Sequence, residues 1–231
     1  MQSSRDEGSD SGKEALLLKI HDFRRAPDCT TKRRQILTRR LHHYMVSYSL
    51  KAKDGTEIVL REPKPNDAKQ LMMFINPIIR EPMSGLLFTS PMTLKAEEAW
   101  LEAMLEQIRK RSIVLLILEI EGRIVGTCSV QRRMWKEKHR AQIGIALSRC
   151  ARGRGIGEVM MRMTVALARR RMPGLELIDL ATYSYNTRAL ALYRKLGFKS
   201  VGCLPHGVKE GHRYYDDVFM VIRTDDLVDT N

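Results

Sequence analysis

The spacing of hydrophobic positions changes repeatedly along this chain, and each change of period predicts a helix or a strand. Two alternating segments between residues 44 and 63 flank a KDG turn, which is typical of a β-hairpin. Beyond them, helical and strand-like periods alternate, so the pattern predicts a mixed α/β domain. The predicted helices cover 65–75, 94–109 (with Thr93 as N-cap), 156 up to Pro173, and 186–198; the predicted strands are two within 112–130, then 140–147, 175–183, 199–204 and 214–222.

A strand, a glycine-rich turn, a helix and a second strand follow one another between residues 140 and 183. This order predicts that Arg140–Leu147 and Leu175–Tyr183 are parallel neighbours joined by a crossover connection. The glycine-rich turn then lies at the carboxyl end of its strand. Open α/β sheets bind their ligands at that end.

The turn itself reads "RCARGRGIGEVMM" and starts at Arg149. A glycine-rich turn that leads into a helix presents backbone N–H groups without internal partners at the positive end of the helix dipole, which favours a phosphate or another anion. Two familiar phosphate loops are excluded. A Walker loop requires GK[ST], whereas Gly157 is followed by Glu158, and a dinucleotide loop requires the spacing GxGxxG.

Charge concentrates around the same turn. The chain carries a formal net charge of +13. Twelve Lys and Arg residues lie between Gln131 and Arg171, against two Glu residues. Such a basic field attracts a polyanionic small ligand, and it equally suits nucleic acid phosphates. Composition alone leaves both alternatives open.

The remaining features indicate a cytoplasmic protein without a membrane span or a metal site. The longest apolar run, Ile113–Leu118, is too short to cross a bilayer, and the first residues lack the order of a signal peptide. Widely spaced Cys29, Cys128, Cys150 and Cys203 predict free, mostly buried thiols.

The beginning of the chain differs from the rest. Residues 1–13 are polar and rich in Gly and Ser, which predicts a disordered tail, and Lys32–Tyr44 has the spacing of a basic amphipathic helix. We therefore divide the chain into an extension, 1–43, and a folded domain, 44–231.

Two motifs together resemble the GNAT superfamily of acyl-CoA-dependent N-acyltransferases. The turn matches the pattern [Q/R]xxGx[G/A] from Arg152 to Gly157. The second pattern, NxxAxxLYxxxGF, is complete at Asn186, Ala189, Leu192, Tyr193, Gly197 and Phe198. The resemblance extends over about Tyr44 to Arg223. It implies a mixed, mostly antiparallel sheet with helices on both faces and a parallel pair of strands splayed at the acyl-CoA site.

The resemblance also implies a reaction and its residues. Acetyl-CoA donates an acetyl group to a primary amine by direct attack on the thioester, without a metal, and Tyr193 protonates the departing thiolate. An alternative role for Tyr193 is packing against the pantetheine. Many relatives carry a Glu where this chain has Gln142. Glu119, Glu121 and His139 are weaker candidates for a base, and none is assigned. The implied cofactor-binding residues are Ile145, Ala146, Leu147, Arg152, Gly153, Arg154, Gly155, Ile156, Gly157 and Asn186.

Several alternatives remain open on the sequence. A small amine, a peptide amino terminus and a lysine side chain are equally compatible acceptors, with the region from Pro65 to Arg111 as the expected acceptor side. The "RGRG" run and Lys32–Arg40 suit an RNA-binding module on the same fold, and Gln142 suits a coenzyme A binder without turnover. The resemblance favours a homodimer.

Overall fold

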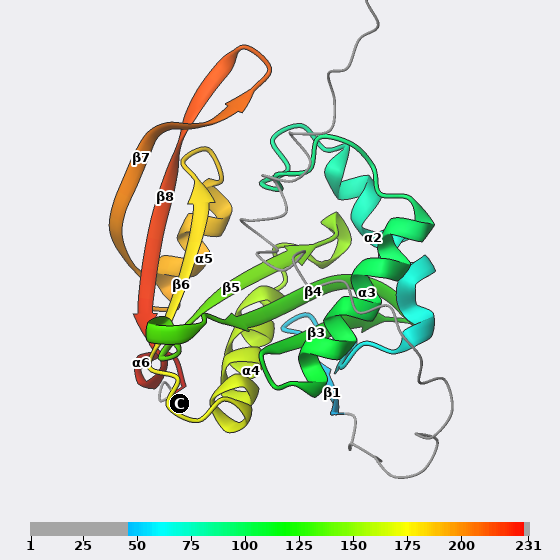
Figure 1. Ribbon diagram of the computed structural model, residues 1–231. Helices are drawn as coiled ribbons and strands as arrows, with labels where there is room; N and C mark the ends of the chain where they lie inside the picture. Colours follow the sequence, from blue (N-terminus) through cyan, green and yellow to red (C-terminus); the bar gives the residue numbers. More distant parts are fainter. Residues whose placement is uncertain (1–45, 229–231) are drawn as a thin grey trace, which may run out of the picture. The chain divides into compact units, whose positions relative to one another are not determined.

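The computed structural model describes residues 46–228, which form a mixed α/β domain built around one sheet (Figure 1). Its strands are β1 (Ser47–Lys51), β2 (Glu57–Arg61), β3 (Ile113–Ile120), β4 (Arg123–Arg132), β5 (Arg140–Leu147), β6 (Leu177–Tyr183), β7 (Lys199–Glu210) and β8 (Arg213–Arg223). Its helices are α2 (Ala68–Ile79), α3 (Leu94–Arg109), α4 (Ile156–Arg171), α5 (Thr187–Lys195) and α6 (Thr224–Val228), with short 3₁₀ turns η1 (Pro65–Asp67), η2 (Trp135–Glu137) and η3 (Arg149–Ala151).

The strands lie in the order β1-β2-β3-β4-β5-β6-β8-β7. All neighbouring strands are antiparallel apart from β5 and β6, which run parallel. The predicted parallel pair, the hairpin at the start of the domain and the mostly antiparallel sheet are therefore confirmed. None of the helices between residues 46 and 228 has the length and hydrophobicity that crossing a membrane requires.

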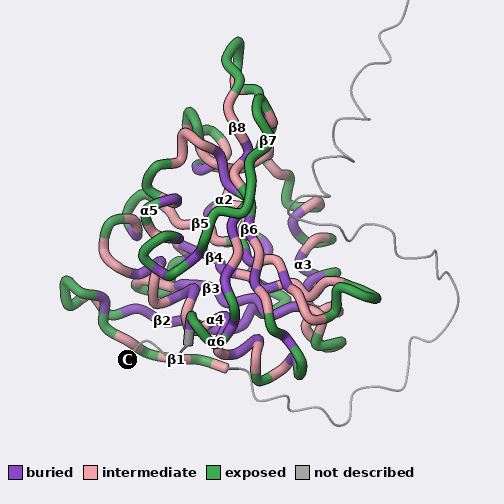
Figure 2. Tube along the Cα trace, turned by 90° about the vertical axis from the view of Figure 1, so that its left-hand side faces the viewer, coloured by how far each residue is buried: buried purple, intermediate pink, exposed green. Residues whose placement is uncertain are grey.

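The central strand β3 is buried on both faces, which explains its continuous apolar run. Val114, Leu116 and Leu118 point into the main core with α4 and α5. Ile117, on the alternate face, packs with α2 and α3. Burial is greatest along these middle strands and falls off toward β7 at the edge (Figure 2). Helices thus cover both faces of the sheet, as predicted.

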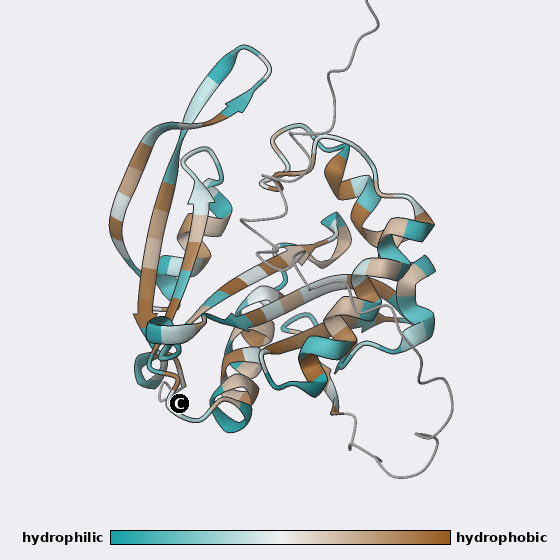
Figure 3. Cartoon of the chain, in the orientation of Figure 1, coloured by the Kyte–Doolittle hydropathy of each residue, from teal (hydrophilic) through white to brown (hydrophobic). Residues whose placement is uncertain are grey.

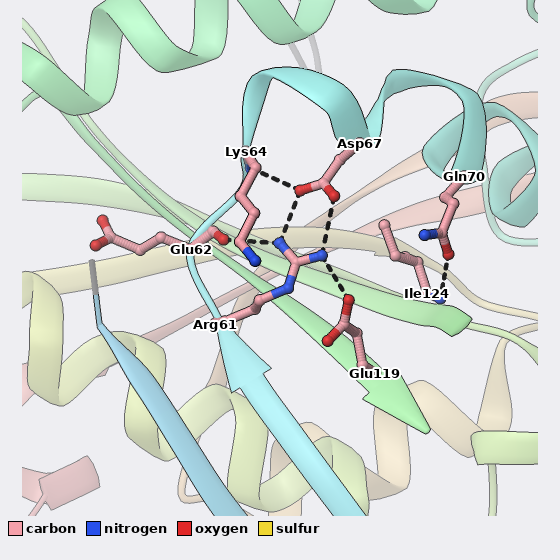
Figure 4. A network of polar contacts seen from close by, with 7 residues as sticks. All are labelled: Arg61, Glu62, Lys64, Asp67, Gln70, Glu119 and Ile124. Atoms are coloured by element: carbon pink, nitrogen blue, oxygen red, sulfur yellow. Dashed lines mark hydrogen bonds and ion pairs between the residues drawn. The ribbon is translucent and has the colours of Figure 1, made fainter. Parts of the chain in front are cut away.

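A buried ion cluster ties β2 to α2 and to β3 (Figure 4). The Arg61 guanidinium donates to both carboxylate oxygens of Asp67, at 2.7 and 2.9 Å, and to Glu119 at 2.5 Å. These hydrogen bonds raise the pKa of Arg61, although burial opposes the change. Asp67 also accepts from the backbone of Lys64 and begins the helical segment. Such bidentate charge-assisted bonds fix geometry, and the loss of one partner would leave a buried charge.

Three predictions are corrected by the structure. The first long helix continues past residue 75 to Ile79 and includes Pro77, because Pro in the last turn removes only one backbone hydrogen bond. The late strands are longer than predicted and form an extended hairpin. Cys128 is buried, but Cys150 and Cys203 are exposed, so thiols are not mostly buried. Cys29 and the predicted extension lie outside the described residues.

Glu97 is an unexpected buried acid in the first turn of α3. Its side chain belongs to the face that packs with Leu101, and burial raises the pKa of its carboxyl to about 7. The folded protein therefore favours the protonated acid more than the unfolded chain does. Stability from this source is complete below pH 4.5 and is lost as the pH rises through about 7.

We predict that Glu97→Gln removes this pH dependence. The difference in unfolding free energy between the variant and the wild type should shift in favour of the variant by up to about 3 kcal/mol when the pH is raised from 5 to 8. Urea unfolding at the two pH values measures the difference. The exposed neighbour supplies a matched control in Glu98→Gln, which should behave as the wild type. Identical pH profiles for the wild type and Glu97→Gln would contradict the prediction.

Candidate active site

The site begins where β5 and β6 stop pairing. Only Arg140–Gln142 pair with Leu177–Asp179, although β5 continues to Leu147 and β6 to Tyr183. Beyond the last pair the two strands diverge (Figure 1). The far edge of β5 remains paired with β4, so the backbone groups of Ile143–Leu147 that face β6 point into a gap.

The closed end of this gap is held by charge. Asp179 accepts hydrogen bonds from Arg133 at 2.9 Å and from Arg140 at 3.3 Å. Its side chain is largely buried, at 14% exposure. Two arginines on one carboxylate lock the start of β5 and β6 together, because loss of either strand's position would separate these charges.

The glycine-rich turn lies at the open end of the gap. Gly153 and Gly155 have φ angles of 77° and 76°, in the left-handed region where other residues are strained. Gly155 is the N-cap of α4. The first amides of α4 therefore face outward with the positive end of the helix dipole. This geometry suits an anion.

Gly157 has a different role from the one expected of the turn glycines. A Cβ atom built on it would lie 3.2 Å from Leu192, 3.4 Å from Leu147 and 3.7 Å from Ile145. The absent side chain lets the start of α4 approach β5 and α5 closely. Ala146, between these two β5 residues, packs on the opposite face with α2 and α3.

The two arginines of the turn are paired with acids. Arg152 donates to the Leu147 carbonyl at 2.8 Å and to Glu81 at 2.6 Å. Arg154 donates to Asp54 at 2.5 Å, and this bond holds the pKa of Asp54 well below its usual range. Both guanidinium groups thus lie beside the turn and are oriented by carboxylates.

Sequence reasoning missed Glu81. It belongs to the loop between α2 and α3, 71 residues from Arg152, and it also contacts Arg149 at 3.2 Å. Glu81 and Arg149 border an open pocket of about 490 Å³ between the end of α2 and η3, which Cys150 also lines. No sequence pattern links the loop to the turn, because only the fold brings them together.

Helix α5 brings the second motif to the same gap. Asn186 is its N-cap and accepts from Ala189 N–H at 3.3 Å. Tyr193 is buried, at 8% exposure, and its ring lies 5.9 Å from that of Phe198. Burial raises the pKa of the Tyr193 phenol, with a smaller contribution from Cys128. The phenol is therefore protonated at neutral pH.

The residues considered as bases are not alike. Gln142 stands in the last parallel pair, at the closed end of the gap. Glu119 is bound to Arg61 in the buried cluster, away from α5. Glu121 is exposed in the β3–β4 turn, and His139 uses its carbonyl to accept from Glu176 and Leu177. Within residues 46–228 no group of three His, Cys, Asp or Glu side chains forms a metal site.

Comparisons with known proteins agree with this geometry. The sequence profile of the acetyltransferase (GNAT) family matches residues 78–198, more than half of the chain. An L-methionine sulfoximine/L-methionine sulfone acetyltransferase from Pseudomonas paraeruginosa (strain DSM 24068 / PA7) is 25% identical over 138 residues, which are 59% of this chain and 77% of that protein.

Solved structures share the fold. The ribosomal-protein-S5-alanine acetyltransferase from Vibrio fischeri superposes with a TM-score of 0.66 at 18% identity, covering 79% of this chain and 98% of that one. A phosphinothricin acetyltransferase from Sinorhizobium meliloti, solved with AcCoA, gives 0.60 at 19% identity, covering 72% and 88%. The resemblance seen in two sequence motifs is confirmed, and the chain belongs to the acetyltransferase (GNAT) family.

Proposed function

We propose that this enzyme transfers an acetyl group from acetyl-CoA to a primary amine by direct attack on the thioester. The observation that carries the proposal is the gap between β5 and β6, which opens beside an anion-binding turn and a buried phenol. The test is to measure the release of free coenzyme A thiol from acetyl-CoA in the presence of each member of a panel of small amines and peptides. No thiol release with any acceptor would contradict catalysis and favour a coenzyme A binder without turnover.

The proposed cofactor site follows the gap. Backbone groups of Ile145, Ala146 and Leu147 that β6 does not pair are suited to the amides of pantetheine. Amides from Arg152 to Gly157 are suited to the pyrophosphate, with Ile156 and Gly157 in the first turn of α4. Asn186 borders the same space from the start of α5.

Phosphates would compete with acids for the two arginines. Arg154 lies on the surface with Asp54, and such solvent-screened pairs contribute little to stability. A pyrophosphate carries more charge than one carboxylate and offers bidentate acceptors. Binding of the cofactor should therefore draw Arg154 from Asp54 at little cost, whereas Arg152 and Glu81 form a largely buried pair.

Tyr193 is the proposed acid. As the tetrahedral intermediate collapses, the C–S bond breaks, the departing sulfur takes the phenolic proton, and the proton that the attacking nitrogen must lose to form the amide restores the phenol. The raised pKa makes the buried Tyr193 phenol a weaker acid than a phenol in water, but burial also raises the pKa of a thiol in the same surroundings. Cys128, a buried neighbour of the gap, illustrates this effect, because burial raises its thiol pKa to about 12.

The amine must lose a proton before it attacks. Gln142 cannot accept one, and Glu119 is held by Arg61. We propose that an ordered water carries this proton to solvent. In this proposal Gln142, at the closed end of the gap, does not act as the base.

The relatives named above do not narrow the acceptor to one class of amine. One relative acts on methionine sulfoximine and methionine sulfone, and the S5 enzyme acts on an alanine of a ribosomal protein. The structure gives no support to the RNA-binding alternative. The two arginines of the "RGRG" run form ion pairs with Glu81 and Asp54, and Lys32–Arg40 lies outside the described residues.

We also propose a homodimer and retain a cytoplasmic location as a prediction. Apolar side chains are exposed on the edge strand β7, with Val201 at 61% and Leu204 at 51%, and on its neighbour β8, with Phe219 at 37%. Both strands carry hydrophobic segments along their length (Figure 3). Exposed apolar surface of this kind commonly marks an interaction site.

Leu204→Asp should convert the dimer to a monomer, because a charge would enter the apolar contact. Multi-angle light scattering measures the mass of each form. Leu94, equally apolar and 39% exposed on α3, provides the control variant Leu94→Asp. A monomeric wild type would contradict the dimer.

Gly153→Val should weaken acetyl-CoA binding at least about tenfold, because a β-branched residue cannot hold a φ of 77° and the turn must change shape. Calorimetric titration measures the affinity. Gly174 has a φ of 76° at the opposite end of α4, so Gly174→Val carries the same strain away from the site. Equal affinities for the two variants would show that the turn does not bind the cofactor.

Tyr193→Phe keeps the ring and removes the proton donor. The transition state should therefore lose more stabilisation by the enzyme than the ground state does. We expect kcat to fall by about 10²–10⁴-fold with an unchanged acetyl-CoA dissociation constant. Single-turnover kinetics isolates the chemical step. Tyr48→Phe, at the far edge of the sheet, is the matched control. Full activity of Tyr193→Phe in the chemical step would leave packing as the role of this side chain.

A further inference from the structure

Three tyrosines and one glutamate form a cluster at the end of β6 and in the β7–β8 hairpin. The ring of Tyr185 lies 5.4 Å from that of Tyr183 and 4.8 Å, edge-on, from that of Tyr215. Its hydroxyl donates to Glu210 at 3.3 Å. Tyr183 is buried, while the other three residues are half-buried and reach the surface.

The loop between α2 and α3 closes onto this cluster. The backbone of Gly85 lies near the Tyr185 hydroxyl and lowers the pKa of that phenol, against the larger effects of burial and of Glu210. Gly85 has a φ of 75°, and a Cβ there would lie 2.6 Å from the Asn186 side chain. Gly85 therefore permits a close approach that no other residue allows. Three segments distant in sequence meet at Tyr185.

The cluster borders the gap opposite the proposed cofactor site. Tyr183 and Ala146 each stand four residues beyond the last parallel pair, Gln142 and Asp179, on facing strands. Ile178 and Leu180 point into the core beneath α4 and α5. Tyr183 alternates with them, so it lies on the other face, where Ala146 packs with α2 and α3.

The chemistry of this wall suits a cation. Aromatic faces attract ammonium groups, and a carboxylate beside them adds an ion pair in a partly dry setting. Burial and the Glu210 carboxylate raise the pKa of Tyr185, which stays a protonated donor. Two basic side chains lie near this cluster. Lys209 lies over the Tyr214 ring at 5.3 Å, and Arg213 stands opposite Glu210 in the hairpin register.

We propose that this cluster is the acceptor-recognition wall and that the acceptor is an amine with a second, positively charged group, which Glu210 and the tyrosine rings bind. The inference rests on the proposed acetyl transfer. The amine that attacks must be neutral, so the charge that Glu210 recognises belongs to the other end of the acceptor. A diamine is the simplest member of this class.

The test compares 1,5-diaminopentane with 1-aminopentane, which share a chain and differ by one ammonium. Wild type should have the higher kcat/KM with the diamine. Glu210→Gln should lower the ratio of the two values about tenfold, as expected for loss of one charged contact, through KM rather than kcat. Tyr185→Phe should lower the ratio less. Glu102→Gln, an exposed acid on α3, should leave it unchanged.

The outcomes separate this inference from the reaction itself. Equal kcat/KM for both amines in wild type, or an unchanged ratio in Glu210→Gln, would overturn the acceptor class while acetyl transfer stands. Failure of every amine to release thiol, with acetyl-CoA still bound in calorimetry, would overturn the proposed function and this inference with it. A fallen ratio with unchanged acetyl-CoA affinity supports the proposal.

Discussion

The end of pairing between β5 and β6 is the constraint on which the site depends. Three residue pairs, with Asp179 between two arginines, hold the strands at one end. At the other end, beyond the last pair, the start of α4 approaches α5 closely where Gly157 lies against Leu192. A sheet that paired along its full length would satisfy these backbone groups internally and leave none for a ligand.

The two sides of this gap differ in charge. The side with the glycine turn is basic, and its arginines are already oriented by Glu81 and Asp54. The other side presents tyrosines and Glu210. A polyanionic cofactor and a cationic acceptor would then approach from opposite faces without competing for the same groups, and the field of each side would favour its own ligand.

The centre of the sheet is held by many buried contacts, whereas the loop between α2 and α3 is held by fewer. The buried Arg61 cluster and the two-sided packing of β3 anchor the centre of the domain. The loop from α2 to α3 instead meets the rest of the site through a few contacts, at Gly85 and Glu81. Loops that carry binding residues on a rigid scaffold are common in enzymes, because they change substrate without changing fold.

The sequence alone was sufficient for features with local causes. The glycines that need a positive φ, the N-cap Asn186 and the change from strand to helix period are set by neighbouring residues, and they placed the turn, α5 and the parallel pair. Tertiary structure decided which groups meet. Arg152 bonds to Glu81, 71 residues away in the sequence, and Arg154 bonds to Asp54, 100 residues away. Tyr185 bonds to Glu210 and lies near Gly85. Such contacts, like the burial of Glu97, depend on how whole elements pack, and no local pattern records that.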